Sequence, residues 1–103
     1  MNITHVTIAG AGTLGSQIAW QTAFHGFDVT VYDVVEKGLE AARVYHRQYA
    51  ALFLESRGAS RDQVDQAMAR LSYTTDLAEA VKDADIVSES LPENIEVQRC
   101  LLY

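Results

Sequence analysis

A glycine-rich turn between a strand pattern and a helix pattern is the feature that most constrains the fold of this chain. Gly10, Gly12 and Gly15 follow the spacing G-x-G-x-x-G. Apolar side chains alternate in the preceding residues 3–9, as they do in a strand, and residues 13–25 have the apolar spacing of a helix. This order of strand, glycine-rich turn and helix is typical of phosphate-binding turns in dinucleotide-binding folds.

Each glycine of the turn has a physical reason to be there. Gly10 permits a tight turn off the strand, Gly12 lets the backbone approach a pyrophosphate, and Gly15 lets the helix pack closely on the sheet. The free N–H groups of the first helical turn then attract the anion, aided by the helix dipole. The candidate pyrophosphate contacts are therefore Gly10, Ala11, Gly12, Thr13, Leu14 and Gly15.

An acidic residue closes the second predicted strand. Residues 28–32 read as a strand, and Asp33 follows it, 18 positions after Gly15. A carboxylate at this place accepts hydrogen bonds from the adenosine ribose and repels a 2′-phosphate, which favours NAD over NADP. Its neighbours Val34 and Val35 supply no positive charge for such a phosphate. The competing interpretation is a glycine-rich turn in a domain that binds no nucleotide, with Asp33 as a strand-end cap.

The remaining patterns predict an α/β fold, namely a partial doubly wound (Rossmann) parallel sheet of about four strands. Two helices separate strands two and three, because an apolar stripe runs from Leu39 to Phe53 and a capping box at Ser60 and Gln63 opens a second stripe. We therefore expect a helical hairpin in this crossover. The other expected elements are strands at 71–74 and 84–89, a short helix at 77–82 capped by Asp76 and Glu79, and a last helix beginning at Pro92.

Composition limits the size and partners of the domain. A chain of 103 residues with 49% hydrophobic content holds one core, and its net charge of −6 argues against nucleic acid or an anionic membrane as a partner. No apolar run reaches the length of a membrane span. Because the first strand begins close to Met1, we expect no targeting segment, and the single Cys100 fits a reducing compartment. We expect a cytoplasmic protein without a bound metal.

Four segments together resemble the NAD-binding N-terminal domain of the 3-hydroxyacyl-CoA dehydrogenase family. The resemblance implies that NAD is the cofactor and that the family reaction oxidises a 3-hydroxyacyl-CoA to the 3-ketoacyl-CoA. It also implies that Glu93 lies near the nicotinamide, whereas Gln98 stands where the family commonly has a lysine. The segments are residues 6–15, 31–33, 74–77 and, most discriminating, 88–94, which read Ser-Glu-Ser-Leu-Pro-Glu-Asn.

The family continues with a catalytic histidine in a His-Phe-x-Asn-Pro-like segment and with a helical C-terminal domain. Neither is present in this sequence. We therefore expect residues 1–103 to form the N-terminal part of the NAD-binding domain, with no catalytic residue of their own and no turnover by this chain alone. Acyl-CoA would be the substrate of the full-length enzyme. His5, His25 and His46 are interpreted as structural residues.

Two other functions stay open on the sequence. One is a stand-alone NAD-binding or regulatory module, and the other is a dehydrogenase of 2-hydroxy or sugar acids on the same fold. An aromatic stripe of Trp20, Phe24 and Phe27 needs a cover, either the helical hairpin or a second subunit. Because strand four would also lack its next neighbour, we expect a homo-oligomer.

Overall fold

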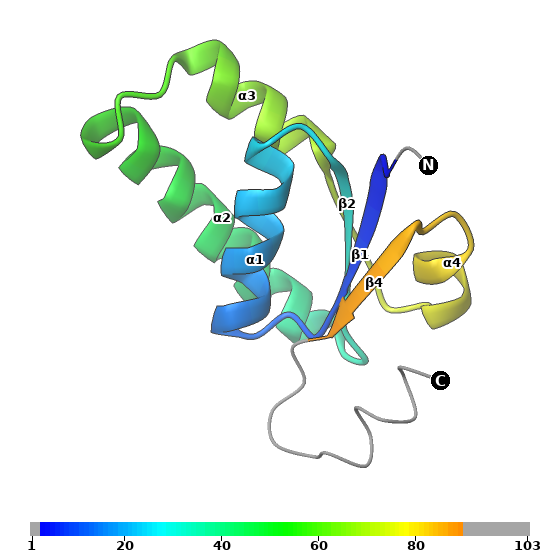
Figure 1. Ribbon diagram of the computed structural model, residues 1–103. Coiled ribbons are helices and arrows are strands. Elements are labelled where there is room, and N and C mark those ends of the chain that lie inside the picture. The colour runs from blue at the N-terminus through cyan, green and yellow to red at the C-terminus, as the bar shows by residue number, and fades with distance from the viewer. Residues whose placement is uncertain (1–2, 90–103) are drawn as a thin grey trace.

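The computed structural model describes residues 3–89 and shows a parallel four-stranded sheet flanked by helices (Figure 1). The strand order is β3-β2-β1-β4, the expected arrangement. None of the helices within these residues is long and apolar enough to cross a membrane. The elements are β1 His5–Ala9, α1 Thr13–Phe24, β2 Asp28–Tyr32, α2 Glu36–Ser56, α3 Arg61–Arg70, β3 Leu71–Thr74, α4 Leu77–Val81 and β4 Ile86–Glu89.

The register of the sheet separates an apolar face from a polar one. Val6 of β1 lies opposite Val29 of β2 and Ile86 of β4, so these side chains share one face. On that face Ile8, Val29 and Val31 are fully buried. The alternate residues, which include His5 and Thr30, point to the other face.

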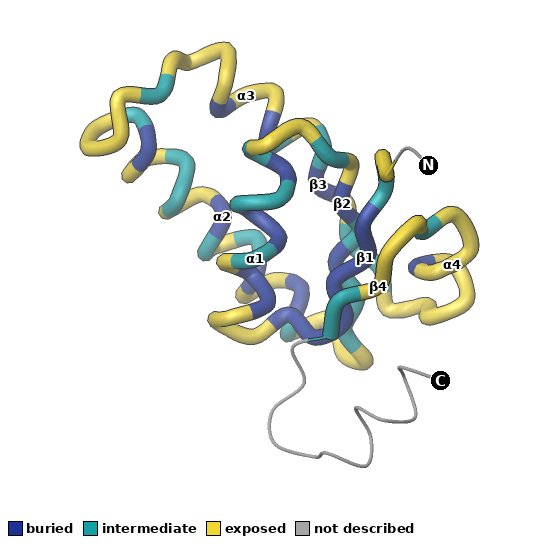
Figure 2. The backbone as a smooth tube through the Cα atoms, in the orientation of Figure 1, coloured by how far each residue is buried: buried dark blue, intermediate teal, exposed yellow. Residues whose placement is uncertain are grey.

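Three helices cover the apolar face of the sheet. Figure 1 shows α1, α2 and α3 on one side, and Figure 2 shows the buried residues concentrated between these helices and the strands. Trp20 of α1 is 1% exposed, and its ring packs edge-on against Phe53 of α2 at 5.4 Å between centroids. The helical hairpin is therefore the cover of Trp20, the first of the two covers expected from the sequence.

The polar face has a smaller cover within the described residues. The five-residue helix α4 lies on this side, opposite α1 to α3 (Figure 1). Its Ala80 is buried, and the Ala80 carbonyl accepts a hydrogen bond from the buried Thr7 hydroxyl. This bond explains how a threonine is accommodated at a fully buried position of the central strand.

Local sequence signals set the helix ends close to where they were predicted. The Ser60 hydroxyl accepts from the Gln63 N–H and the Gln63 side chain accepts from the Ser60 N–H, so the capping box is confirmed. Asp76 caps α4 as expected, because its carboxylate accepts from the Glu79 N–H. The side chain of Glu79, which was expected to take part in the cap, instead forms an ion pair with Lys82 at 3.4 Å. At the end of α1, Gly26 has φ +103°, and the N–H groups of Gly26 and Phe27 return to the last turn.

Asp85, directly before β4, forms hydrogen bonds to the beginning of β1. One oxygen of its carboxylate accepts from the Thr4 N–H at 2.9 Å and from the His5 N–H at 3.0 Å. These hydrogen bonds lower the pKa of Asp85. Two apolar side chains of β4 are exposed to solvent, Ile86 by 42% and Val87 by 38%.

Candidate functional site: a dinucleotide cradle

The glycine-rich loop lies at the carboxyl ends of the central strands, between β1 and α1. Gly10 has φ +100°, a conformation that residues with a side chain rarely adopt, and its N–H donates to the Tyr32 carbonyl at 2.8 Å. Gly12 is the N-cap of α1, and among residues 3–89 no neighbouring atom lies within 4 Å of the place where its Cβ would stand. The protein itself therefore does not require glycine at position 12, but a ligand approaching the backbone there would.

The first turn of α1 has the electrostatics of an anion site. It contains no acidic residue, so no carboxylate of its own competes for the positive end of the helix. Gly12, Thr13 and Leu14 are exposed, and Leu14 is 61% accessible. Leu14 thus points into solvent beside the loop, while Gly15 is buried.

Asp33 is held directly beside the loop. One carboxylate oxygen accepts from the Ala11 N–H at 3.1 Å, and the other accepts from the Val35 N–H at 3.2 Å. Gly38, in the first turn of α2, leaves room for this side chain, because a Cβ there would lie 2.7 Å from the Asp33 carboxyl carbon. The structure thus brings together the loop and the predicted ribose-binding carboxylate, in an arrangement that two main-chain N–H groups fix.

One predicted contact falls outside the described residues. Glu93, expected near the nicotinamide, lies beyond residue 89, as do Gln98 and the helix expected from Pro92. Glu89, the last residue of β4, lies opposite Ala9 and so belongs to the same edge of the sheet as the loop. The need for glycine at position 38 could not be recognised from the sequence pattern, because it depends on where the Asp33 side chain lies.

The three histidines lie away from the loop opening. His5 lies at the amino end of β1 and its Nε2 atom is 2.8 Å from the Thr30 hydroxyl. His25 follows α1, and its Nδ1 donates to the Gln21 carbonyl, in agreement with its interpretation as a structural residue. His46 is fully buried between α1 and α2. None of them is placed to act on a ligand at Gly12.

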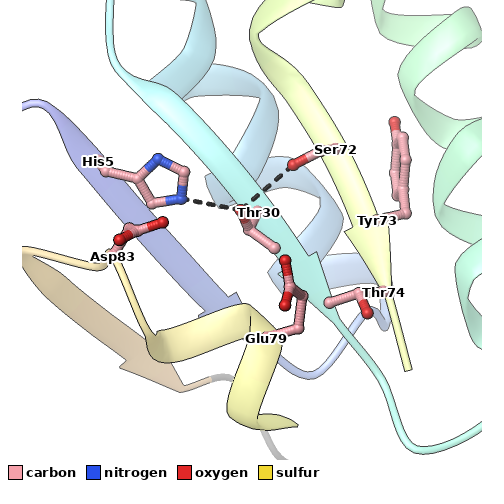
Figure 3. A pocket seen from close by; sticks show the side chains of 7 residues that line it. All are labelled: His5, Thr30, Ser72, Tyr73, Thr74, Glu79 and Asp83. Carbon is pink, nitrogen blue, oxygen red and sulfur yellow. Dashed lines mark hydrogen bonds between the residues drawn. The ribbon is translucent and has the colours of Figure 1, made fainter. Parts of the chain in front are cut away.

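A concavity of about 330 Å³ lies on the polar face of the sheet. Figure 3 shows His5 directed toward Thr30 and Asp83 nearby, with the Thr30 hydroxyl 3.2 Å from that of Ser72. Tyr73 points to the opposite side, toward the helices. This pocket contains no residue of the glycine-rich loop, so we assign the cofactor to the loop and not to the pocket. The lining residues are His5, Thr30, Ser72, Tyr73, Thr74, Glu79 and Asp83.

Burial changes the titration of the His46 cluster. Desolvation lowers the pKa of His46, although its hydrogen bond to the Ser16 carbonyl acts in the opposite direction. Burial raises the pKa of Tyr73, whose hydroxyl bonds His46, while the positive charges of Arg43 and Arg47 partly oppose this shift. Both side chains are therefore neutral around neutral pH.

The lowered pKa of His46 predicts an acid-sensitive stability. Below about pH 6.5 the unfolded chain takes up a proton that the folded chain still resists, so the free energy of unfolding falls. The loss continues until the pH reaches the folded-state pKa. Urea unfolding between pH 8 and pH 5 measures it, with His46→Gln as the control that should flatten this window. If the free energy of unfolding fell with pH as steeply in His46→Gln as in wild type, His46 would not be the group responsible. Asp85 does not interfere, because its lowered pKa means that its contribution to stability is lost at more acid pH.

A parallel sheet with a glycine-rich loop at the start of α1 and a carboxylate after β2 defines a dinucleotide-binding domain. The family profile described as "3-hydroxyacyl-CoA dehydrogenase, NAD binding domain" matches residues 5–102. The chain therefore belongs to the 3-hydroxyacyl-CoA dehydrogenase family, as its NAD-binding domain, and NAD is the cofactor of this domain.

Curated and structural relatives agree with this assignment. A probable 3-hydroxyacyl-CoA dehydrogenase of Caenorhabditis elegans is 34% identical over 95% of this chain and 34% of its own length. A probable 3-hydroxybutyryl-CoA dehydrogenase of Bacillus subtilis is 36% identical over 92% of this chain and 33% of its own length. The chain thus spans about a third of the length of these relatives.

Two solved structures resemble the fold closely. The 3-hydroxybutyryl-CoA dehydrogenase of Escherichia coli is 29% identical, with a TM-score of 0.89 over 98% of this chain and 21% of its own. A diketoreductase, described as acting on dicarbonyl compounds, is 46% identical, with a TM-score of 0.87 over 98% of this chain and 36% of its own.

Proposed function

We propose that this domain binds NAD at the glycine-rich loop and thereby serves the interconversion of 3-hydroxyacyl-CoA and 3-ketoacyl-CoA. The observation that carries the proposal is the Asp33 carboxylate held at the Ala11 N–H, beside the open approach to Gly12. Bound NAD supplies a nicotinamide that takes up hydride from the substrate alcohol. The proposed cofactor contacts are Gly10, Ala11, Gly12, Thr13, Leu14, Gly15, Asp33 and, on the nicotinamide side, Glu93.

Different residues of the cradle contact different parts of the cofactor in this proposal. The N–H groups of the first turn of α1 donate to the pyrophosphate oxygens, and the Asp33 carboxylate accepts from the adenosine ribose. Val34 is 73% exposed directly after Asp33, which leaves an apolar side chain in solvent where it can cover the adenine. This placement favours a dinucleotide over a free phosphate, because a phosphate alone would leave Val34 and Asp33 unused.

Hydride transfer also needs a base at the substrate hydroxyl, and none of the three histidines in residues 3–89 is placed at the cradle. His5 lies at the opposite end of β1 and His46 is enclosed by its own hydrogen bonds. We therefore propose that the 103-residue chain binds the cofactor but does not turn over acyl-CoA. In the longer relatives, positioning and the base would come from sequence outside the described residues.

Titration of the chain with NADH, followed by its fluorescence, tests the first part of the proposal. We expect saturable binding, and absence of binding at millimolar NADH would refute it. NADH oxidation by acetoacetyl-CoA at high protein concentration tests the second part, with no turnover expected. Saturable turnover that His5→Ala, His25→Ala or His46→Ala abolishes would place a base within this chain.

The diketoreductase similarity supports a second candidate function. At 46% identity over 98% of this chain, it exceeds the identities of the acyl-CoA dehydrogenases given above. Those dicarbonyl compounds that have a ketone β to a second carbonyl share this feature with a 3-ketoacyl-CoA, so the same cofactor cradle would serve both. In a longer protein containing this domain, NADH oxidation by 2,4-pentanedione, without any CoA ester, would favour the dicarbonyl substrate.

The remaining parts of the proposal concern partners and location. We propose a homo-oligomer, since Ile86 and Val87 expose apolar surface along β4. A cytoplasmic location fits one cysteine in 103 residues, although a rat relative that is 32% identical is described as mitochondrial.

A further inference from the structure

A buried histidine connects three elements behind the glycine-rich loop. His46 of α2 is 0% exposed, and both of its ring nitrogens have partners. Its Nε2 atom lies 2.8 Å from the Ser16 carbonyl oxygen of α1, and its Nδ1 atom lies 2.6 Å from the Tyr73 hydroxyl of β3. The ring therefore joins the helix that begins at the loop to the neighbouring helix and to the sheet.

The partners of His46 define its tautomer. A carbonyl oxygen can only accept, so the proton of the neutral ring lies on Nε2, which donates to Ser16. Nδ1 is then an acceptor, and the Tyr73 hydroxyl donates to it. Both nitrogens of the buried ring therefore have a hydrogen-bond partner. The Tyr73 hydroxyl donates to His46, and His46 donates to Ser16.

Ser16 also reaches the glycine-rich loop through a second group, its side-chain hydroxyl. The buried Ser16 hydroxyl donates to the Ala11 carbonyl at 2.9 Å. The Ala11 N–H donates in turn to the Asp33 carboxylate. Ala11 is thus held at its carbonyl by the helix that follows the loop, and at its N–H by the predicted ribose-binding residue.

We propose that Tyr73, His46 and Ser16 form a positioning relay that fixes the glycine-rich loop for the dinucleotide. This proposal rests on the proposed cofactor function of the loop. Apolar residues could fill the space between α1 and α2 without any hydrogen bonds to satisfy, whereas the polar chain gives the helices one relative orientation. A loop fixed before binding loses less conformational freedom when the cofactor arrives, which raises affinity.

His46→Leu tests the relay with an apolar side chain of similar size. It leaves the Ser16 carbonyl and the Tyr73 hydroxyl without their partner, and we expect NADH to bind about tenfold more weakly, or about 1.4 kcal/mol. His46→Gln offers an amide N–H to Ser16 and an amide oxygen to Tyr73, so it should restore affinity to within about threefold. Ser16→Ala removes only the contact with Ala11 and should weaken binding about fivefold.

Val64→Ala separates positioning from general loss of stability. Val64 is 3% exposed on α3 and its side chain belongs to the core, so its truncation destabilises the fold. Because it makes no contact in the relay, it should leave the NADH dissociation constant unchanged at a temperature where all variants are folded. Equal weakening in Val64→Ala and His46→Leu would overturn the proposal.

Hydrogen exchange of the Ala11 N–H gives a readout that needs no cofactor. We expect faster exchange in His46→Leu and Ser16→Ala than in Val64→Ala and wild type. Unchanged exchange in both relay variants overturns the relay even if NADH binds. If wild type fails to bind NADH but exchange responds, the proposed function fails and the loop-fixing role stands. If His46→Leu does not fold, Ser16→Ala and His46→Gln decide the question.

Discussion

Replacing Gly12 by valine is expected to weaken NADH binding by at least about 100-fold, or roughly 2.7 kcal/mol, while lowering the free energy of unfolding by only about 1 kcal/mol, the cost of an unfavourable N-cap. The two effects separate because a Cβ at position 12 meets no atom of the described part of the chain within 4 Å, and the backbone there has φ −64°, which any residue adopts. The added side chain instead fills the space through which a pyrophosphate reaches the N–H groups of α1. Fluorescence titration and urea unfolding measure the two quantities.

Gly26→Ala is the matched control for this experiment. At Gly26 there is also free space for a Cβ, but φ is +103°, so a side chain strains the backbone by about 1–3 kcal/mol. This position lies at the opposite end of α1 from the loop. We expect the control to lose stability and keep its affinity for NADH, unlike Gly12→Val. Loss of affinity in both variants, or in neither, would contradict the assignment of the loop.

The choice of cofactor is expected to depend on the charge of Asp33. Wild type should bind NADH about 100-fold more tightly than NADPH, because the carboxylate accepts from a ribose hydroxyl and repels a 2′-phosphate. In Asp33→Asn the preference should fall to about tenfold or less, since the amide removes the repulsion and keeps one of the two acceptors. Parallel titrations with both cofactors at constant ionic strength measure the ratio.

Asp28→Asn provides the control for the change in net charge. Asp28 is an exposed residue at the amino end of β2, the same strand that Asp33 follows at its carboxyl end. Its substitution removes the same unit of charge at a place remote from the cradle, so the ratio of affinities should stay at the wild-type value. A similar fall in both variants would show that overall charge, rather than the position of Asp33, sets the preference.

The fold could be predicted from the sequence because its signals are local. Gly26 ends α1, the capping box at Ser60 begins α3, and alternating apolar residues define β1 and β2. The strand order then follows from the βαβ connections and from the family resemblance. The predicted bounds differ from the observed ones by a few residues, as for β4, which begins at Ile86 instead of residue 84.

Other features of the site could not be predicted from spacing, because they depend on three-dimensional contacts. The structural role predicted for His46 is confirmed, but its partners Ser16 and Tyr73 lie 30 and 27 positions away. The bond from the Ala11 N–H to Asp33 and the space left by Gly38 likewise depend on how β1, β2 and α2 meet. The contact proposed for Glu93 stays a prediction.

The hydrogen bonds of Asp85 also bear on the order in which this chain can assemble. They join β4 to Thr4 and His5, which lie 81 and 80 positions earlier, whereas β1 and β2 are separated by a single helix. Docking β4 closes the longest loop of the described sheet, and contacts so far apart in sequence form slowly. The loop and Asp33 belong instead to the first and most local unit, so the cradle can take shape before the sheet acquires its fourth strand.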